Sequence, residues 1–156
     1  MKEIPLTKGF VALVDDEDFE ALSKYRWHVT ECGRNRYAER SVREGKRVRK
    51  ILMHREILQP HPGMHVDHRD GDGLNNQRAN LREATRSQNQ HNRGKSCNNT
   101  SGYKGVSRHS RDGSWAASIS KDGKHINLGY YATPELAYGA YCRAAEELHG
   151  EFKRIE

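Results

Sequence analysis

Three runs of alternating residues near the C-terminus constrain the fold more than any other feature of the sequence. They cover residues 103–109, 115–121 and 125–131, and RDGS and DG between them signal tight hairpin turns. Thr133 and Pro134 then open a helix, because threonine caps a helix N-terminus and proline loses no hydrogen bond at the first position. Gly150 ends this helix, whose single apolar stripe contains Ala137, Ala140, Tyr141, Ala144, Ala145 and Leu148. The pattern predicts three antiparallel strands with one long helix packed across them.

The rest of the chain cannot build one large core. Only 34% of its 156 residues are apolar, and the mean hydropathy is −1.03. A chain of this length forms one ordinary domain or two small ones, so two modules with modest cores fit this composition better. Cys32, Cys97 and Cys142 are odd in number and form no CxxC pair, which indicates neither a disulfide framework nor a thiolate zinc site.

The hydropathy pattern argues against a membrane protein and against an exported one. No run approaches the roughly eighteen apolar residues of a membrane-spanning helix. The N-terminal sequence MKEIPLTKGF has no apolar stretch of the kind found in signal peptides. We therefore expect a cytoplasmic protein with no membrane partner.

Residues 1–58 combine strand and helix patterns. The run FVALV (10–14) suits a short strand, and EDFEALSKY (17–25) suits a short helix with acids in its first turn. Residues 26–30 and 36–42 favour a hairpin around the glycine turn ECGRN. The run VRKILMHREIL (48–58) is compatible with a strand that runs into a helix, which periodicity alone does not decide. We expect a mixed α/β lobe that acts as a scaffold or clamps DNA.

Pro60 and Pro62 mark a break, after which the sequence becomes polar. A short strand over 64–67 leads into a long loop of glycine, asparagine and aspartate. A second short strand is expected near 80–82, followed by a polar helix from about Ser87. We therefore predict an α+β chain with four parts: an N-terminal lobe over 1–58, a strand–strand–helix core over 59–95, a linker over 96–101 and the three-stranded module over 102–156.

The charge distribution indicates a polyanionic partner. The net charge is +6, and the isoelectric point is near 9.3. A basic composition alone is weak evidence, because many basic proteins bind no polyanion. Between residues 93 and 124, however, the sequence contains seven cations and only two aspartates. Such a local excess of positive charge is typical of surfaces that contact phosphates. We therefore expect a nucleic acid as the partner.

Four polar residues have a spacing that suits a catalytic centre. Asp67 and His68 are adjacent, and Asn80 and Asn89 follow the histidine by twelve and twenty-one residues. Neighbours on a strand point to opposite faces, so Asp67 and His68 reach different partners. Carboxylate and amide oxygens suit a hard divalent ion such as Mg²⁺ or Mn²⁺, and an imidazole beside it can deprotonate water. Each residue alone is more often a turn former or a solvated side chain, so the joint spacing carries the inference.

These residues lie in segments that resemble the HNH nucleases, and within them the phage and intron-encoded homing endonucleases of the ββα-metal fold. The matching segments are MHREIL (53–58), HVDHRDGDGLNN (65–76), ANLR (79–82) and SQNQHN (87–92). The resemblance implies that His68 is the general base and that Asp67 and Asn89 hold one metal ion. It also implies that Asn80 holds the loop that orients His68.

The sequence departs from the pattern of this family at some positions. Many members have histidine where Asn89 stands, and His91 two residues later is a minority alternative as a ligand or phosphate contact. The CxxC pairs that bind zinc in other members are absent, so the local fold must rest on packing. His54 matches a recurring position of the family, where core packing and a phosphate contact are both open.

Residues 102–152 resemble the Apetala-two DNA-binding domain of plant ethylene-response factors, in SGYKGVSR (101–108), WAASI (115–119), LGYY (128–131) and residues 133–152. The resemblance implies that the sheet lies in the major groove and that its outward side chains contact DNA. We expect these contacts from Lys104, Arg108, Lys121, His125 and Asn127. Ser107, Ser118 and Ser120 replace arginines of the plant proteins, so base specificity does not transfer and phosphate contacts should dominate.

A basic chain with these motifs has three candidate functions. The leading prediction is a metal-dependent endonuclease of the homing type, encoded by a phage or mobile element, that nicks double-stranded DNA. One Mg²⁺ or Mn²⁺ ion serves its single active site, and no protein partner is implied. The alternative is a DNA-binding regulator with an inactive nuclease centre, against which the intact set of four residues argues. An RNA-binding protein ranks last because no RNA-binding motif is recognisable.

Overall fold

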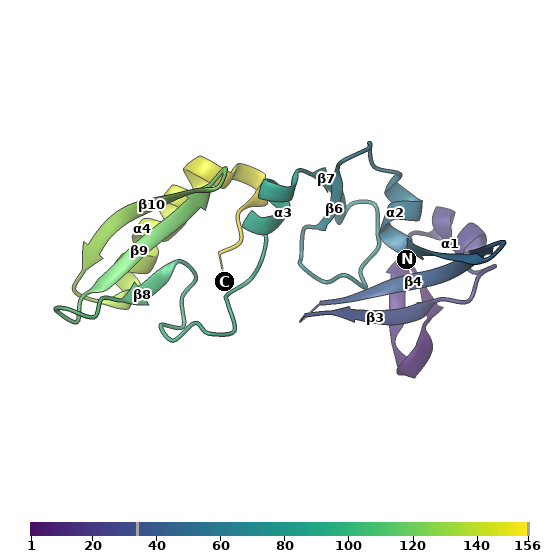
Figure 1. Cartoon of the computed structure of the whole chain (residues 1–156), viewed down its shortest axis with the longest axis horizontal. Coiled ribbons are helices and arrows are strands. Elements are labelled where there is room, and N and C mark those ends of the chain that lie inside the picture. Colours follow the sequence, from purple (N-terminus) through teal and green to yellow (C-terminus); the bar gives the residue numbers. More distant parts are fainter. Residues whose placement is uncertain (34, 156) are drawn as a thin grey trace. The chain divides into compact units, whose positions relative to one another are not determined.

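The computed structural model describes residues 1–33 and 35–155. The chain divides into two compact units, unit 1 (1–85) and unit 2 (86–156), which are treated separately below. Helices and antiparallel sheets occur in both (Figure 1), which confirms the predicted α+β class. No helix among the described residues is long and apolar enough to cross a membrane.

Within its described residues, unit 1 contains three small antiparallel sheets and two short helices. Its elements are β1 (Lys2–Pro5), β2 (Val11–Val14), α1 (Asp16–Leu22), β3 (His28–Cys32), β4 (Asn35–Glu44), β5 (Arg47–Leu52), α2 (Met53–Leu58), β6 (His65–His68) and β7 (Leu81–Ala84). The sheets are β1-β2, β3-β4-β5 and β6-β7. The predicted strand, helix, hairpin and strand-into-helix segments are all present. The predicted turn between β3 and β4 includes Arg34, which lies outside the described residues.

The strand β1 was not expected, because its sequence KEIP offers only one buried apolar residue, Ile4. It forms through its pairing with β2, where Ile4 lies opposite Ala12. Both residues are buried in the core of unit 1. A strand this short has no alternation to read in the sequence, so only its partner strand defines it.

A single core runs through the whole of unit 1. Trp27 is its largest fully buried side chain, and its indole N–H donates to Leu22 O over 2.9 Å. The core extends across the predicted boundary at residue 58, since it combines Ile4, Leu6, Ala12, Val14, Leu22, Trp27, Ala38, Met53, Ile57, Val66 and Leu81. The N-terminal lobe and the β6-β7 hairpin therefore pack as one body, and the chain divides between residues 85 and 86 instead.

Hydrogen bonds attach the loop between β6 and β7 to the N-terminal segment. Leu13 N donates to Leu74 O over 2.9 Å, and Asn76 N donates to Leu13 O over 2.8 Å. The Asp15 carboxylate accepts from Arg78 N over 2.8 Å and from the Gln77 amide over 3.2 Å. A polar loop of this length would be mobile without such partners, so the N-terminal segment acts as its scaffold.

Unit 2 contains the predicted three-stranded sheet and its helix. Its elements are α3 (Arg86–His91), β8 (Val106–Arg108), β9 (Trp115–Lys121), β10 (Lys124–Tyr131), α4 (Pro134–His149) and a 3₁₀ turn (Gly150–Phe152). The strand order is β10-β9-β8. Thr133 caps α4 as predicted, because its hydroxyl accepts from Leu136 N over 3.3 Å. Ala117, Ile119, Ala137, Ala140 and Ala145 are buried between the sheet and α4.

The strand β8 is shorter than the alternating run 103–109. Gly105, just before it, adopts φ +72, and a Cβ at this position would collide with the Tyr141 ring and with Ser118 O. The Ser101 hydroxyl donates to Val106 O over 2.8 Å. The chain therefore turns tightly before β8, and α4 packs against the backbone of Gly105.

Candidate active site

The strand β6 places Asp67 and His68 at adjacent positions opposite β7. Asp67 pairs with Arg82 and His68 pairs with Leu81. The Asp67 carboxylate Oδ2 accepts from Arg82 Nε over 2.8 Å and from Arg82 Nη2 over 2.7 Å. Both side chains are almost fully buried, with exposed fractions of 5% and 7%. Arg82 was not singled out in the sequence, where nothing marks it as the partner of Asp67.

The His68 ring lies in a cluster of aromatic side chains from three elements. Its centroid is 5.1 Å from that of His54 on α2 and 5.8 Å from that of Tyr37 on β4. The His54 and Tyr37 rings are 5.5 Å apart, edge to face. His54 and His68 are both buried, with exposed fractions of 6% and 5%. His54 is therefore packed against the predicted general base, a neighbour that the sequence did not identify.

Burial keeps both imidazoles in the neutral form. It lowers the pKa of His54 to about 3, with a smaller contribution from the neighbouring His68. Burial also lowers the pKa of His68, although a side-chain hydrogen bond with Asn76 and the nearby carboxylates, Asp70 first, oppose the shift. A neutral imidazole can accept a proton, which is the protonation state that a general base requires.

Asn80 connects the two ends of the loop that follows His68. Its Nδ2 donates to Asp70 Oδ1 over 2.9 Å and to Asn75 O over 2.8 Å. Its Oδ1 accepts from Asp70 N over 3.1 Å, and its backbone oxygen accepts from Arg69 N over 2.9 Å. One asparagine thus fixes the residues directly after His68, and the orientation of the imidazole by Asn80 stays a prediction.

Gly73 brings the same loop against β4. A Cβ at this position would collide with Arg36 O and with the Tyr37 ring. Tyr37 in turn contacts His68, so the close approach at Gly73 links the loop to the aromatic cluster. The need for a glycine at this position was not evident from the sequence, where Gly71 and Gly73 look equivalent.

Asn89 and His91 lie on α3, which belongs to unit 2. The side chain of Asn89 is half-buried, and its pairing with Asp67 stays a prediction. The His91 ring stacks on that of His149, with 3.7 Å between centroids. Lys104 Nζ donates to His91 O over 2.6 Å and to Arg154 O over 3.4 Å. The helix is therefore attached to the sheet and to the C-terminal segment of unit 2.

The donor chemistry of the predicted ligands fits a hard divalent ion. Asp67 offers carboxylate and Asn89 offers amide oxygen, and Mg²⁺ commonly takes one or two such ligands together with water and substrate phosphates. Among the described residues, no group of three or more histidine, cysteine, aspartate or glutamate side chains could hold an ion alone. Water and substrate phosphates would complete the coordination of an ion held by these two residues.

The predicted DNA contacts of unit 2 fall into three kinds. His125 pairs with Ser120 and Asn127 pairs with Ser118, so both lie on the sheet face that points away from α4. Arg108 and Lys121 are exposed at strand ends, although strand alternation places them on the side of α4. Lys104 differs from its expected outward orientation, because it is half-buried and its ammonium group binds carbonyl oxygens.

The outward sheet face carries no lysine or arginine within the described strands. Its members are Ser107, Ala116, Ser118, Ser120, His125, Asn127 and Tyr130. Tyr130 is 55% exposed and is the only tyrosine of this set, whereas Tyr131 and Tyr138 pack beside the core. The cations of the three strands therefore lie outside this face.

Comparison with known proteins gives two family matches and two relatives. The family model HNH endonuclease matches residues 59–91, and the AP2 domain model matches residues 101–151. An "Uncharacterized HNH endonuclease L560" of Acanthamoeba polyphaga mimivirus is 34% identical over 147 residues, which cover 93% of this chain and 74% of that protein. "Protein 3.8" of Escherichia phage T7 is 36% identical over 93 residues, 60% of this chain and 76% of that protein. No solved structure matches.

Proposed function

Because this chain belongs to the HNH endonuclease family, we propose that it nicks double-stranded DNA, with His68 as the general base and one divalent ion. The family assignment makes it a DNA-cleaving hydrolase, and the AP2 domain is a second DNA-binding part of the same chain. The observation that carries the assignment of the base is the buried, neutral imidazole of His68 at the end of β6, followed by a loop that Asn80 fixes.

The proposed reaction is hydrolysis of one phosphodiester bond. His68 accepts a proton from water, and the resulting hydroxide attacks the phosphorus in line with the leaving 3′ oxygen. The bond between phosphorus and this oxygen breaks, so the products carry a 5′ phosphate and a 3′ hydroxyl group. An Mg²⁺ or Mn²⁺ ion held by Asp67 and Asn89 would supply positive charge beside the phosphate.

The residues around His68 have supporting roles in this proposal. Asn80 keeps the loop in one conformation, which fixes the direction of the imidazole. Arg82 holds the Asp67 carboxylate in one orientation through two hydrogen bonds. Positioning of this kind supplies a large part of the rate in phosphoryl transfer. A single centre of this type cuts one strand per binding event, which supports nicking.

The viral source of both relatives supports a protein that is encoded by a phage or mobile element and acts in the cytoplasm of a host cell. A homing function fits this origin and the presence of a separate DNA-binding domain. Site-specific binding would come from unit 2, while the cleavage residues other than Asn89 lie in unit 1.

The proposal is tested by conversion of supercoiled plasmid to the open-circular form, with Mg²⁺, Mn²⁺ or EDTA. We expect nicking only with a divalent ion and none with His68→Ala. His65→Ala is the matched control, because His65 lies on the same strand but is exposed, and it should nick as the unchanged protein does. Cleavage in EDTA or by His68→Ala would contradict the proposal. Tight binding without cleavage of any DNA would favour the regulator.

A further inference from the structure

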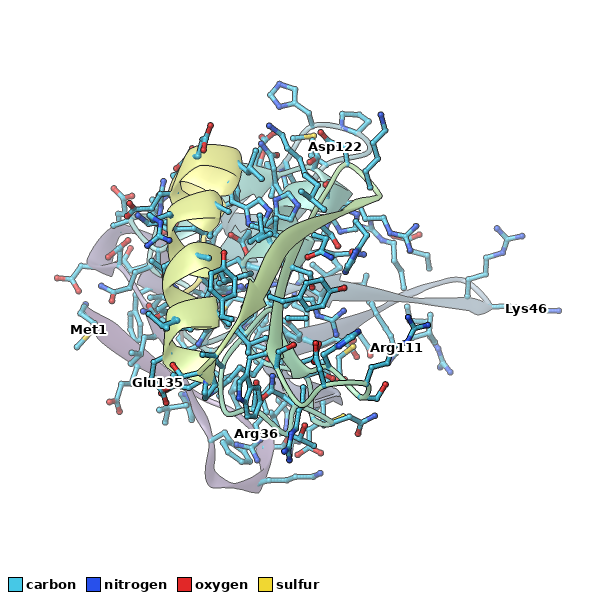
Figure 2. The ribbon with its side chains drawn as sticks, turned by 90° about the vertical axis from the view of Figure 1, so that its left-hand side faces the viewer. Met1, Arg36, Lys46, Arg111, Asp122 and Glu135 are labelled. Carbon is cyan, nitrogen blue, oxygen red and sulfur yellow. The ribbon has the colours of Figure 1, made fainter. Side chains whose placement is uncertain are left out.

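The strands β4 and β5 continue beyond the sheet to which they belong. The strand β3 pairs with β4 only as far as Glu39, whereas β5 pairs with β4 from Glu39 to Glu44. Residues 40–44 and 47–51 therefore form a two-stranded ribbon of five residue pairs without a third strand. At ~3.3 Å per residue its length is roughly 17 Å. Lys46 lies in the turn at the far end of this ribbon (Figure 2).

The ribbon concentrates positive charge. Its distal part, REGKRVRK (43–50), has five cations and one acid, and every residue in it is exposed. Arg49 pairs with Glu44 over 3.2 Å, and Lys50 pairs with Glu39 over 2.9 Å. Among the described residues, Arg43, Lys46 and Arg47 have no ion pair. These three cations, called the ribbon cations below, are available to an outside anion.

The ribbon cations point in different directions. Arg43 lies beside Val48 on one face, and Arg47 lies beside Glu44 on the other, because neighbouring pairs of a hairpin alternate between faces. Lys46 is in the turn between the strands. A surface that binds a flat anionic partner needs its charge on one face only. Charge on both faces and at the tip instead fits a partner that surrounds the ribbon on two sides.

We propose that the β4-β5 ribbon enters a groove of the DNA that the enzyme cuts, where the ribbon cations contact phosphates of both strands. This inference rests on the proposed function, because it takes double-stranded DNA as the partner. The major groove of B-form DNA is ~12 Å wide and admits a two-stranded ribbon. Its phosphates line both sides of the inserted element, which matches the two faces of charge. The ribbon is then a DNA-contacting element of unit 1, separate from the AP2 domain.

A different explanation of the charge is protection of an exposed sheet edge. Cations on edge strands prevent proteins from pairing edge to edge, and β5 is an edge strand. Within the ribbon both β4 and β5 have a free edge, so that explanation accommodates Arg43 and Arg47, and only Lys46 in the turn lies outside it. It also predicts that removal of the ribbon cations changes self-association and leaves DNA affinity unchanged.

The test is the salt dependence of binding to a mixed-sequence duplex DNA, measured by fluorescence anisotropy in EDTA with the full chain. The variant carries Arg43→Gln, Lys46→Gln and Arg47→Gln. The control carries Lys8→Gln, Lys24→Gln and Arg26→Gln, which removes the same charge from exposed positions elsewhere in unit 1. Glutamine keeps most of each aliphatic stem, and circular dichroism and the melting temperature show whether both variants stay folded.

Each phosphate contact adds about 0.9 to the slope of log affinity against log salt. We expect the substitutions in the ribbon to reduce the magnitude of this slope by about 2 to 3. They should also weaken binding roughly tenfold or more at physiological salt. The control should change the slope by less than about 1. Equal effects of the two variants would overturn the inference, since they would reflect net charge alone. A larger loss on duplex RNA than on duplex DNA would also overturn it, because the major groove of RNA is too narrow for a ribbon.

This outcome is separable from the proposed function, because binding in EDTA requires no cleavage. If the plasmid assay shows nicking but the ribbon variant binds normally, the ribbon proposal fails alone. If the ribbon variant loses affinity but no DNA is nicked, the proposed reaction fails alone.

Discussion

Units 1 and 2 place their polar residues in opposite ways. Among the described residues, unit 1 buries five polar or charged side chains, and all of them lie on or between α2 and β7: His54, Asp67, His68, Asn76 and Arg82. Unit 2 buries two, Asn92 and His149. Its core consists mainly of alanine, isoleucine and tyrosine, and it exposes Arg108, Lys121, His125 and Asn127. Burying charged groups is costly unless each has a partner. Under the proposed function, the chemistry would depend mainly on the interior of unit 1, and DNA contact on the exterior of both units.

The largest effect should follow from removal of Arg82. Arg82→Leu leaves the Asp67 carboxylate buried without its guanidinium, which should destabilise unit 1 by about 3 to 5 kcal/mol. Chemical unfolding is followed through Trp27 fluorescence in a Trp115→Phe background, since Trp27 lies in the core of unit 1. The double variant Asp67→Leu with Arg82→Leu should recover most of the loss. An Arg82→Leu variant as stable as the unchanged protein would show that the pair is not buried as described.

A core substitution in unit 2 should have a smaller effect, confined to that unit. Gly105→Ala introduces a Cβ against the Tyr141 ring at φ +72, and the strain and overpacking should cost about 2 to 4 kcal/mol. Gly102→Ala is the matched control, because Gly102 has φ +81 but nothing near its Cβ. It should cost only the backbone strain, about 1 kcal/mol. Hydrogen exchange of the β8–β10 amides measures both. Equal losses would mean that the contact with Tyr141 is unimportant.

The stability of unit 1 should depend on pH through His54. Its folded pKa is about 3, below the ordinary value of 6.5, so the unfolded chain takes up the proton first. Stability is therefore complete above pH 6.5 and is lost as the pH falls toward 3, by up to about 1.4 kcal/mol per pH unit for one proton. His54→Gln should make this slope shallower by about one proton, as measured by urea unfolding at several pH values. An unchanged slope would mean that His54 is accessible to protons in the folded state.

The smallest effects should come from single cations of unit 2. Arg108→Gln and Lys121→Gln should each lower the salt slope of DNA binding by about 1, because both side chains are exposed. Lys104→Gln should lower it less, because its ammonium group is held by carbonyl oxygens. Anisotropy titrations at several salt concentrations compare the three. A larger change for Lys104 than for Arg108 would contradict this ranking.

The sequence predicted the elements of this chain better than it predicted their partners. Alternation and turn residues located β9, β10 and α4, because a period of two or a capped helix is encoded locally. The joint spacing of Asp67, His68, Asn80 and Asn89 predicted a catalytic centre. The first three lie in unit 1 and Asn89 in unit 2, and their shared role stays a prediction. The ion pair of Asp67 with Arg82 was not predictable, because it depends on the register of β6 against β7.

Contacts between distant elements could not be predicted from the sequence either. The cluster of Tyr37, His54 and His68 joins β4, α2 and β6, and none of the three positions shows in its own segment that it meets the others. Lys104 looked like an outward cation because its segment alternates. The strand β8, however, begins only at Val106, after the tight turn at Gly105, so Lys104 lies outside the strand. Local patterns specify faces, and the packing of the unit decides what those faces meet.

The role that we propose for His68 lies in the chemical step and not in binding. Its most direct test is the single-turnover cleavage rate with DNA bound to saturation, measured beside the dissociation constant for the unchanged protein and for His68→Ala. We predict a loss of cleavage by about 10² to 10⁴-fold with an unchanged dissociation constant. A His68→Ala variant that cleaves at the normal rate once saturated, and differs only in affinity, would contradict it.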